Sequence, residues 1–220
     1  MVGKMKIGLI GGTGNEGKGL AIRLGKNQFE IYIGSRNQKK AFLTTKILKE
    51  QYPEGIFKPG TNEEIARICD IIILTIPFAN HKEILKKLES FLINKIIIDT
   101  VCPITVQKGK VQLLENEYNS VAESAQNYCP KSKIVGAFHN VSALELLSSK
   151  IKLKGDVIVC SDNNKAKQKV FELIHSIKNL RPIDGGALKN SRYPEQFSAM
   201  LITLNIKYKV NTSLLFKEIP

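Results

Sequence analysis

The glycine-rich segment from Lys6 to Arg36, KIGLIGGTGNEGKGLAIRLGKNQFEIYIGSR, constrains the fold more than any other part of the chain. It places Gly12, Gly14 and Gly17 in the spacing G-x-G-x-x-G, between a strand-like apolar run and a helix-like amphipathic run. In a βαβ unit such a turn puts the N-terminus of the helix against a pyrophosphate. The segment therefore predicts a dinucleotide-binding unit and, with it, a parallel sheet.

The second strand of this unit ends in Ser35 and Arg36 rather than in an acidic residue. A carboxylate there would accept hydrogen bonds from a free ribose 2′-hydroxyl, whereas arginine pairs with a 2′-phosphate. Ser35 can donate its hydroxyl to the same phosphate, and Arg36 can donate from its planar guanidinium. Lys40, one helical turn further, is either a third contact to the phosphate or an exposed helix lysine. The segment predicts NADP as the cofactor.

Short apolar runs alternate with amphipathic stretches along the whole chain, which predicts an α/β fold. We expect a Rossmann-type, doubly wound, mainly parallel sheet with a small C-terminal helical extension, because the runs IIILTI and KIIID require both sheet faces to be covered. The expected strands are Lys6–Ile10, Glu30–Gly34, a short one at Ile56–Phe57, Ile71–Thr75, Lys95–Asp99, Ile134–Ala137 and Val157–Cys160. The expected helices are Gly17–Lys26, Gln38–Gln51, Asn62–Arg67, Asn80–Phe91, Val121–Asn127, Asn163–Ile177 and Ser191–Tyr208.

No repeat, low-complexity tract or flexible linker divides the 220 residues, so a single compact unit is expected. Within it, residues 1–137 form the NADP-binding Rossmann core, and residues 138–220 form a smaller part that completes a cleft. Segment Thr100–Ser132 is the least regular and follows a central strand, which favours a lid or substrate loop. The tail, residues 209–220, shows no clear periodicity.

The net charge and the spacing of the cysteines limit which partners and which kinds of site the sequence predicts. A formal charge of +13 implies anionic partners, but the lysines are spread along the chain, so we expect solvated faces and no nucleic-acid site. The four cysteines show neither a CxxC pair nor metal-ligand spacing, which predicts reduced thiols and no metal. Cys102, after a strand end, is the one cysteine expected near the chemistry. No apolar stretch reaches the roughly eighteen residues that a membrane span needs. A cytoplasmic protein without membrane contact is expected.

Three further segments follow predicted strand ends, at the sheet edge where open α/β folds bind ligands. In LTIPF, Ile76 ends the strand and Phe78 packs either on a nicotinamide ribose or on the core. In DTVCPI, Asp99 either contacts a ligand or bonds backbone N–H groups of its own turn, and Ile104 follows. In GAFHNVSA, His139 serves either proton transfer or the orientation of a loop. No spacing suggests covalent catalysis.

The motifs GGTGNEGKGLAIRL, IGSR, LTIPF, GAFHNVSA and LRPIDGGALKNSR resemble, in order and spacing, the NADPH-dependent reductases of coenzyme F-420, an 8-hydroxy-5-deazaflavin. The likeness covers roughly Lys6 to Tyr208, and its last motif together with FHNVSA is much more specific than the first two. In that family a hydride passes directly between the nicotinamide and deazaflavin rings, which stack in a cleft at the sheet's carboxyl edge. The resemblance implies an oxidoreductase with NADP and coenzyme F-420 as co-substrates, a homodimer, and no catalytic side chain.

The resemblance also implies which residues form the site. Together with Gly12 of the glycine motif, it assigns NADP binding to Thr13, Gly14, Asn15, Glu16, Ser35, Arg36 and Lys40. Phe78, Ile104 and Ala143, beside Ile76, would border the nicotinamide, while His139, as an orienting residue, and Val141 would face the deazaflavin. Arg192, in the segment that shapes the far side, either pairs with an acidic tail or stabilises a helix N-terminus.

Some residues depart from the family pattern. Glu16 replaces the apolar residue expected after GGTGN, and a carboxylate beside the pyrophosphate is expected to point outward. Cys102 stands where an aliphatic residue is usual, and the end KVNTSLLFKEIP matches no family motif. A basic cleft is expected to steer both phosphate-bearing coenzymes.

Two alternatives remain open from the sequence. One is a different NADPH-dependent reductase on the same fold, such as a flavin-dependent ferric reductase or an imine reductase. The other is a non-enzymatic NADP sensor. The apolar last helix, with Phe197, Met200, Leu201 and Leu204, suits either a core or a subunit interface.

Overall fold

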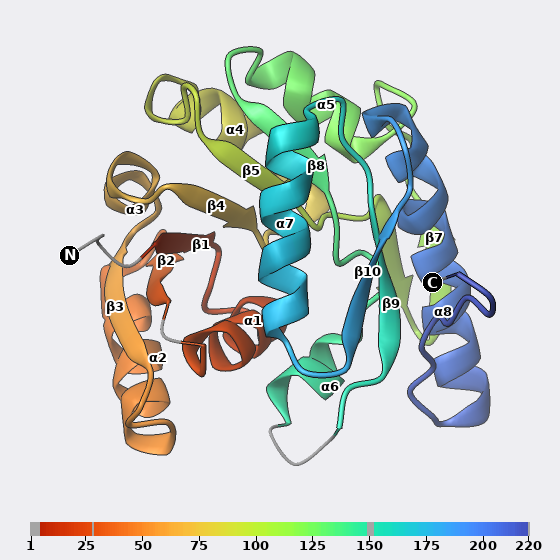
Figure 1. The fold of residues 1–220 in the computed structure, drawn as a ribbon, viewed down its shortest axis with the longest axis horizontal. Helices are drawn as coiled ribbons and strands as arrows, with labels where there is room; N and C mark the ends of the chain where they lie inside the picture. Colours follow the sequence, from red (N-terminus) through yellow and green to blue (C-terminus); the bar gives the residue numbers. More distant parts are fainter. Residues whose placement is uncertain (1–4, 28, 149–151, 220) are drawn as a thin grey trace.

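The computed structural model describes residues 5–27, 29–148 and 152–219, and its centre is a parallel sheet (Figure 1). The six strands are β1 (Lys6–Ile10), β2 (Glu30–Ser35), β3 (Ile56–Thr61), β4 (Ile71–Leu74), β5 (Ile96–Asp99) and β8 (Lys133–Gly136). They lie in the order β3-β2-β1-β4-β5-β8, and every neighbouring pair is parallel. The chain reverses its direction of strand placement between β3 and β4, beside β1. This confirms the predicted doubly wound Rossmann-type sheet.

Helices cover both faces of the sheet. One face carries α1 (Asn15–Gly25), α2 (Gln38–Gln51), α6 (Ala143–Leu147) and α7 (Asn164–Ser176), and the other carries α3 (Asn62–Ile68), α4 (His81–Leu88) and α5 (Val121–Tyr128). Strand β4 shows why two layers are needed: Ile71 and Ile73 join one apolar core, and Ile72 and Leu74 join the other. Successive side chains of a strand point to opposite faces, so an all-apolar strand must be buried on both sides.

Polar caps fix where several of these helices begin. The Asn37 side chain accepts a hydrogen bond from the backbone of Lys40 at the start of α2, and Asn163 does the same for α7. Thr61 and Glu64 form a reciprocal capping box at the start of α3. These side chains satisfy backbone N–H groups that have no partner in the first helical turn. Short 3-10 helices, η1 (Phe78–Asn80) and η2 (Glu89–Phe91), flank α4.

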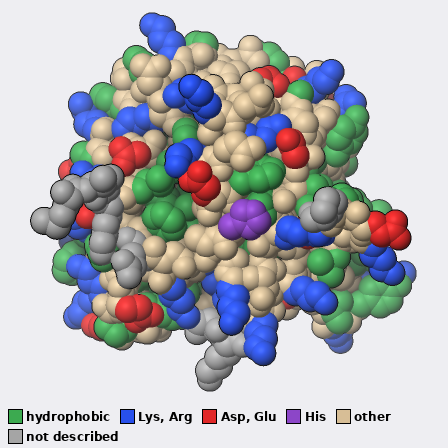
Figure 2. All heavy atoms as spheres, viewed as in Figure 1, with side chains coloured by type: hydrophobic (Ala, Val, Ile, Leu, Met, Phe, Trp, Pro, Cys, Tyr) green, Lys and Arg blue, Asp and Glu red, His purple; other side chains and the backbone are tan. Residues whose placement is uncertain are grey.

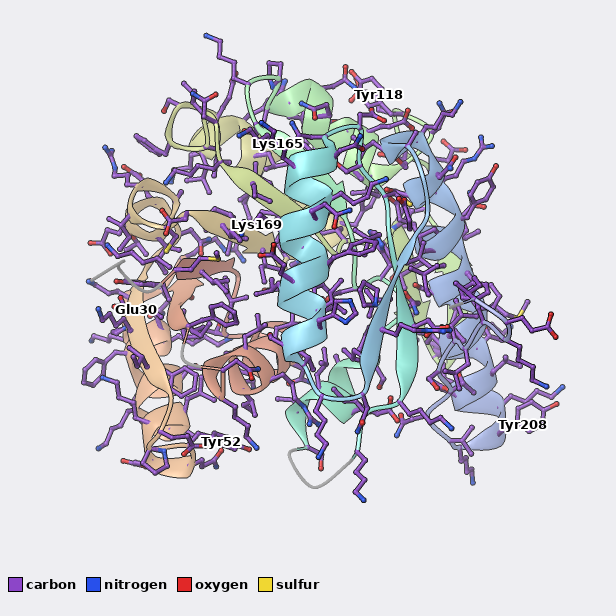
Figure 3. All side chains as sticks on the ribbon, in the orientation of Figure 1. Glu30, Tyr52, Tyr118, Lys165, Lys169 and Tyr208 are labelled. Atoms are coloured by element: carbon purple, nitrogen blue, oxygen red, sulfur yellow. The ribbon has the colours of Figure 1, made fainter. Side chains whose placement is uncertain are left out.

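The remaining elements lie beyond β8. Strands β9 (Gly155–Val159) and β10 (Leu180–Asp184) form a parallel pair, and α7 connects them. One antiparallel bridge between Gly136 and Cys160 joins this pair to the main sheet. The short 3-10 helix η3 (Leu188–Ser191) leads into α8 (Arg192–Tyr208), the predicted C-terminal helix. Tyr208 lies at the end of α8 on the outside of the molecule (Figure 3).

The segment expected to be the least regular contains an antiparallel hairpin. Strands β6 (Ile104–Gln107) and β7 (Lys110–Leu113) pair through a turn at Lys108 and Gly109, both of which have positive φ. The hairpin packs against α8, and the expectation of an irregular loop was wrong for this part. Strand β10 was not expected, because Arg181 and Pro182 interrupt its apolar pattern.

The aperiodic tail is ordered by polar contacts with the second strand pair. The buried Asp156 of β9 accepts two hydrogen bonds from Arg181 of β10, each 2.8 Å, and one from the backbone N–H of Phe216, 2.6 Å. Arg181 also donates to the backbone oxygens of Phe216 and Ile219. Within the described residues, no helix combines the length and apolarity needed to cross a membrane.

Candidate active site

The glycine turn between β1 and α1 leaves room for a ligand. A side chain at Gly17 would lie 2.5 Å from the Cα of Gly12, so this glycine lets α1 pack directly on the turn. A Cβ at Gly14 would meet only the backbone oxygen of Gly11, at 3.6 Å, and would otherwise enter open space. Gly14 is the N-cap of α1 and supplies no side-chain cap, so the first N–H groups of the helix face this space. The arrangement is an anion-binding cradle.

The end of β2 provides the cationic groups beside this cradle. Ser35 is buried, and its hydroxyl oxygen accepts a hydrogen bond from the backbone N–H of Asn37, 3.1 Å. Arg36 and Lys40 are exposed, and neither forms an ion pair with another residue that the structure describes. A free guanidinium and a free ammonium at this strand end are available to a phosphate group.

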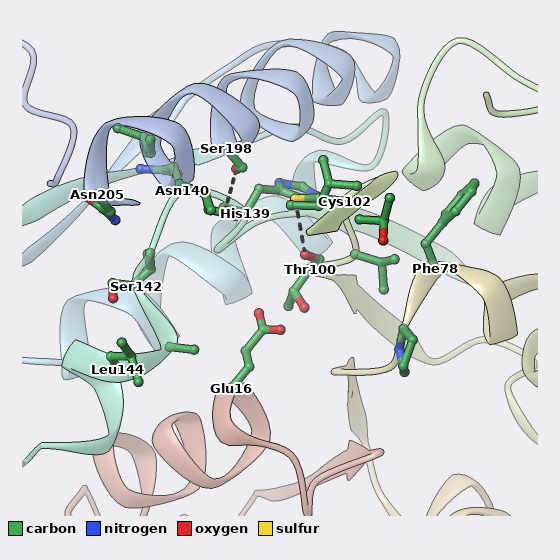
Figure 4. Close-up of a pocket in the computed structure, with 18 of the residues that line it drawn as sticks. Glu16, Phe78, Thr100, Cys102, His139, Asn140, Ser142, Leu144, Ser198 and Asn205 are labelled. Carbon is green, nitrogen blue, oxygen red and sulfur yellow. Dashed lines mark hydrogen bonds between the residues drawn. The ribbon is translucent and has the colours of Figure 1, made fainter. Parts of the chain in front are cut away.

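A cavity of about 750 Å³ opens at the carboxyl ends of β4, β5 and β8 (Figure 4). Its volume lies within the usual range for small-molecule sites. Half of the residues predicted for the site line it: Glu16, Ile76, Phe78, Ile104, His139, Val141 and Ala143. The other predicted residues lie outside the cavity, at the glycine turn and after β2: Gly12, Thr13, Gly14, Asn15, Ser35, Arg36 and Lys40. The two groups meet at the first turn of α1.

Much of the far wall was not predicted. It comes from the end of the hairpin, α6, α8 and the tail, with Leu114, Leu144, Ser198, Leu201, Ile202, Asn205, Ile206, Val210, Asn211 and Thr212. Ser198, Leu201, Ile202 and Asn205 share the i, i+3, i+4, i+7 spacing of one helix face. That spacing could have indicated a lining face, but the predicted apolar stripe on this helix also included Phe197 and Met200, which are 40% and 52% exposed.

Glu16 corrects one expectation. Its carboxyl group points into the cavity toward Thr100 instead of outward (Figure 4). Gly17 holds the first turn of α1 tightly on Gly12, which places the preceding residue beside the ends of β4 and β5. Burial raises the pKa of the Glu16 carboxyl to about 7, the Thr100 hydroxyl opposes that rise, and the charge of Asp99 adds to it. A carboxyl group that is half neutral at pH 7 can occupy this position.

His139 lies on the floor of the cavity with unused hydrogen-bonding capacity. Phe138 before it has a φ of 66°, a left-handed conformation that a bulky residue rarely adopts, and Ser198 donates a hydrogen bond of 2.6 Å to the backbone oxygen of His139. Neither ring nitrogen has a hydrogen-bond partner among the described residues. Burial lowers the pKa of His139 to about 4, against the opposite effect of Asp99, so the ring is neutral at pH 7.

A buried acid from α8 supports this floor. Glu195 accepts hydrogen bonds from the backbone N–H groups of Val121 and Ala122, at 2.8 and 3.2 Å, at the start of α5. One of its oxygens lies 4.0 Å from Nε2 of His139. Burial raises the pKa of Glu195 to about 8, although the two N–H groups oppose the rise. Glu195 thus joins α8 to the start of α5 and lies beside the ring of His139.

The surroundings of Asp99 and Cys102 do not suit groups that react with a substrate. Asp99 is fully buried, receives a hydrogen bond from the N–H of Val101 and contacts Nε2 of His81 at 2.8 Å, so it holds its own turn. Cys102 lines the cavity, as its position after a strand suggested, but burial raises the pKa of its thiol and keeps it protonated. All four cysteines are free, and no group of described side chains could hold a metal ion.

The lining of the cavity is not basic. The described residues that line it include one carboxyl group, Glu16, and one histidine, and they include no lysine or arginine. On the face that Figure 2 shows, basic side chains are instead scattered among acidic ones. On α7, for example, Lys169 pairs with Glu172, and Lys165 lies exposed (Figure 3). The expected basic cleft is therefore restricted to the outer end, at Arg36 and Lys40.

The residues present fit a dinucleotide with a second ring system. The open space at Gly14 suits a pyrophosphate, and the free cations after β2 suit a 2′-phosphate. The ring nitrogens of His139 and Oδ1 of Asn140 are buried polar atoms at the cavity that have no hydrogen-bond partner among the described residues. Buried polar atoms normally have a partner, so these atoms point to a polar ligand.

Comparison with known proteins identifies one family. The profile of the family described as "NADP oxidoreductase coenzyme F420-dependent" matches residues 6–103. The "F420-dependent NADP reductase" of Methanocaldococcus jannaschii is 38% identical, over 93% of this chain and 94% of that protein. The protein of the same name from Methanothermobacter thermautotrophicus is 32% identical, over 98% of this chain and 96% of that protein.

A solved structure shows the same fold. The structure of a putative F420-dependent NADP-reductase from Arthrobacter sp. FB24 has a TM-score of 0.84 and covers 97% of this chain and all of its own, at 21% identity. The sequence relatives extend over nearly the whole length of the chain, so the likeness includes the hairpin and α8 as well as the glycine turn. The chain belongs to the F420-dependent NADP reductase family.

Proposed function

We propose that this protein transfers a hydride between NADP(H) and coenzyme F-420. The observation that carries the proposal is a single cavity that begins at Glu16, beside the glycine turn, and ends against α8. A nicotinamide ring that enters from the turn and a second ring that enters from α8 would share it. The named relatives, similar over nearly the full chain, support the deazaflavin as that second ring.

We assign the outer site to the phosphates and ribose of NADP. The backbone of Gly12, Thr13, Gly14 and Asn15 would hold the pyrophosphate, because it forms the cradle at the N-terminus of α1. Ser35, Arg36 and Lys40 would hold the 2′-phosphate. Since Ser35 already accepts a hydrogen bond from Asn37, its hydroxyl hydrogen is available for donation to that phosphate.

The inner site would hold the two rings. Ile76, Phe78, Ile104 and Ala143 would border the nicotinamide, and His139 and Val141 would face the deazaflavin. When bound, the coenzymes supply the hydride donor and acceptor carbons. The chain supplies an apolar wall that excludes water, a neutral His139 that can donate one hydrogen bond and accept another, and a fixed relative orientation. No side chain needs to form a covalent bond.

Anaerobic mixing of the protein with NADPH and oxidised coenzyme F-420 tests this function. The visible absorbance of the deazaflavin should disappear as NADPH is consumed, and flavin mononucleotide should be reduced far more slowly. Turnover of flavin without turnover of deazaflavin would instead indicate a flavin-dependent reductase. NADP binding without turnover of either substrate would indicate a sensor.

We also propose a homodimer that pairs through the outer face of α8. Tyr193, Phe197, Met200 and Tyr208 are exposed on this helix, at 40% to 60%, although they are apolar or aromatic. Such residues are enriched at subunit interfaces. Sedimentation should give twice the chain mass, and Met200→Asp should reduce it to one chain mass. A monomeric parent protein would contradict the proposed homodimer.

The charge distribution and the thiols support two further proposals. Dispersed lysines favour small anionic coenzymes over nucleic acid, so binding to duplex DNA should be weak and should vanish in moderate salt. Four free cysteines suit a reducing compartment, and we place the protein in the cytoplasm.

A further inference from the structure

Glu16 lies where its charge can act on a ligand in the cavity. It is the second residue of α1, two residues after Gly14, and the single carboxyl group among the described residues that line the cavity. No lysine or arginine of the described lining can neutralise it. Figure 4 shows Thr100 in front of it, and the Thr100 hydroxyl, which donates a 2.7 Å hydrogen bond to the backbone oxygen of Leu74, offsets only part of the effect of burial on Glu16.

The nicotinamide end of a bound dinucleotide must pass this carboxyl group. This step rests on the proposed function. The pyrophosphate lies at the N-terminus of α1, and the cavity begins within the same helical turn, at Glu16. The walls on either side, Ile76 to Phe78 after β4 and Val141 to Ala143 after β8, are apolar apart from Ser142. The ring therefore meets one ionisable group on its way in.

The two oxidation states of the coenzyme differ in the charge at this point. The oxidised nicotinamide ring carries a positive charge, and the reduced ring is neutral, whereas the phosphates are the same in both. A carboxylate next to the ring attracts the oxidised form only, and the attraction is stronger in a cavity than in water. We propose that Glu16 sets the relative affinity of the site for NADP⁺ and NADPH, and that it does so in a pH-dependent manner.

The other ionisable groups around Glu16 do not supply this effect. From the end of β5, Asp99 is held by His81 of α4 and by the N–H of Val101, and Cys102 is a protonated thiol. From the loop after β8, His139 is neutral above about pH 5 because burial lowers its pKa to about 4. From α8, Glu195 bonds the N-terminus of α5 and does not line the cavity.

The sign of the pH dependence follows from linkage. Burial raises the pKa of Glu16 to about 7, a cationic ring would lower it again, and a neutral ring would not. The ratio Kd(NADP⁺)/Kd(NADPH) should therefore fall as the pH rises from about 6 to about 8. If the ring charge lowers the Glu16 pKa by about one unit, the ratio falls about tenfold between its low-pH and high-pH limits, of which about fivefold lies between about pH 6 and about pH 8. The tenfold fall is equivalent to about 30 mV in the two-electron potential of the bound coenzyme.

Titrations without coenzyme F-420 test the proposal. Both dissociation constants are measured from pH 5.5 to pH 8.5 for the parent protein, Glu16→Gln and Glu16→Asp. The ratio should be independent of pH in Glu16→Gln and close to the low-pH ratio of the parent protein, while Glu16→Asp should keep part of the dependence. Glu145→Gln is the matched control, because burial also raises the pKa of Glu145 but its side chain lies outside the cavity.

A second measurement uses the parent protein alone, so it does not depend on the folding of a variant. Calorimetry at pH 7 in two buffers of different ionisation enthalpy should show that NADP⁺ binding releases up to about half a proton more than NADPH binding. The 2′-phosphate, with a second pKa near 6, contributes equally to both coenzymes and cancels in the difference. Equal proton release, or the same pH-dependent ratio in Glu16→Gln, would overturn the role of Glu16. Failure of both coenzymes to bind would instead contradict the proposed function.

Discussion

Arg36 is the residue on which the choice of cofactor depends. It is exposed after β2 and free of ion pairs within the described chain, so its guanidinium can pair with a 2′-phosphate. Arg36→Asp should weaken NADP binding by about 2 to 3 kcal/mol, roughly 30-fold to 150-fold, because it removes charge-assisted hydrogen bonds and adds repulsion. NAD binding, which lacks the phosphate, should change much less, as titration of both coenzymes would show.

A matched substitution controls for net charge. Lys46→Asp changes the charge by the same amount on an exposed face of α2, where Lys46 lies 4.0 Å from Glu50. It should affect both coenzymes slightly and equally, since surface charges are screened by salt. Equal losses of NADP and NAD affinity in Arg36→Asp would contradict the reading of Arg36 as a 2′-phosphate contact.

The sequence predicted the positions of some single residues correctly and missed or misplaced others. The turn glycines and Arg36 were placed correctly relative to the strands, because a local motif determines their geometry. The direction of Glu16 was wrong, since it depends on how tightly Gly17 packs on Gly12 and on how burial changes the protonation of the carboxyl group. Ser198 was missed as a lining residue because its role depends on where α8 docks.

Two glycines of the turn between β1 and α1 have different roles: Gly17 allows α1 to pack closely, and Gly14 leaves space for the ligand. Gly17→Ala places a Cβ 2.5 Å from the Cα of Gly12 and 2.8 Å from Oγ1 of Thr75, so α1 must shift. We expect it to lower the free energy of unfolding by about 2 to 3 kcal/mol. Gly14→Ala finds open space and has an ordinary φ of −74°, so the poorer N-cap and the lower entropy of the unfolded chain should nearly cancel, within about 0.5 kcal/mol.

The effects of the two substitutions on NADP affinity should have the opposite order to their effects on stability. The new Cβ of Gly14→Ala would occupy the space of the pyrophosphate, and NADP affinity should fall about tenfold or more in a protein of unchanged stability. Urea unfolding and coenzyme titration of both variants would measure the two effects. A destabilised Gly14→Ala, or full NADP affinity in that variant, would show that the turn does not hold the coenzyme in this way.

The polar anchor of the tail gives a pH-dependent prediction at the level of elements. Arg181 holds the pKa of Asp156 below its usual range, burial opposes this, and the N–H of Phe216 adds to it. A carboxyl group with a lowered pKa in the folded state stabilises the fold above its unfolded-state pKa and loses this effect as the pH falls through the folded-state value. Asp156→Asn should therefore cost about 2 kcal/mol at pH 7, discounted because Arg181 is 35% exposed, and progressively less below about pH 4.

Urea unfolding at pH 7 and at pH 3 to 4 would measure the difference in stability. Trypsin should also cut the tail of Asp156→Asn after Lys209 and Lys217 faster than that of the parent protein, because the strand pair no longer holds residues 212–219. Glu218→Gln, an exposed acid of the same tail, should leave both measurements unchanged. Equal cleavage of Asp156→Asn and the parent protein would show that other contacts hold the tail.

Elements were predictable where one local signal determined them. The strands of the main sheet and the capped helices α2, α3, α5 and α7 were found, because apolar runs and caps act over a few residues, whereas the short capped helix α6 was not among the expected helices. Strand β10 was missed because Arg181 serves the tail rather than an apolar face, and because Pro182 is tolerated beside an open edge. The β6–β7 hairpin was missed because its side chains are largely exposed and its support comes from α8, almost one hundred residues later.

For the whole molecule, the sequence determines the net charge but not the distribution of charged side chains. It predicts anionic partners from an excess of 13 positive charges, but it does not predict where those charges lie. In the structure they are scattered on the outside, and Arg36 and Lys40 stand at the outer end of the site. The described lining of the ring cavity instead carries one acid. Basic residues can therefore attract the coenzymes, while a nearly neutral interior receives their rings.

We propose that residues 1–220 unfold as one cooperative unit, even though residues 138–220 form a separate strand pair and helix. One apolar core runs from Ile7 of β1 to Leu180 of β10. Arg23 of α1 also donates hydrogen bonds to the backbone oxygens of Glu145 and Leu146, at 2.7 and 3.0 Å, and so joins the first part to the second. A fragment of residues 1–137 would lack the part of that core from Phe138 to Leu180, which would expose the apolar side chains packed against it, so the fragment should not fold alone.

Because the chain contains no tryptophan, one inserted tryptophan can report on each part. Tyr52→Trp, after α2, and Tyr208→Trp, at the end of α8, should give coincident urea transitions (Figure 3). Since the cavity is lined by both parts, NADP at about one hundred times its Kd should raise the free energy of unfolding by about 2.7 kcal/mol at both probes. Separate transitions, or a coenzyme effect confined to the Tyr52→Trp probe, would show that the C-terminal part folds independently of the coenzyme site.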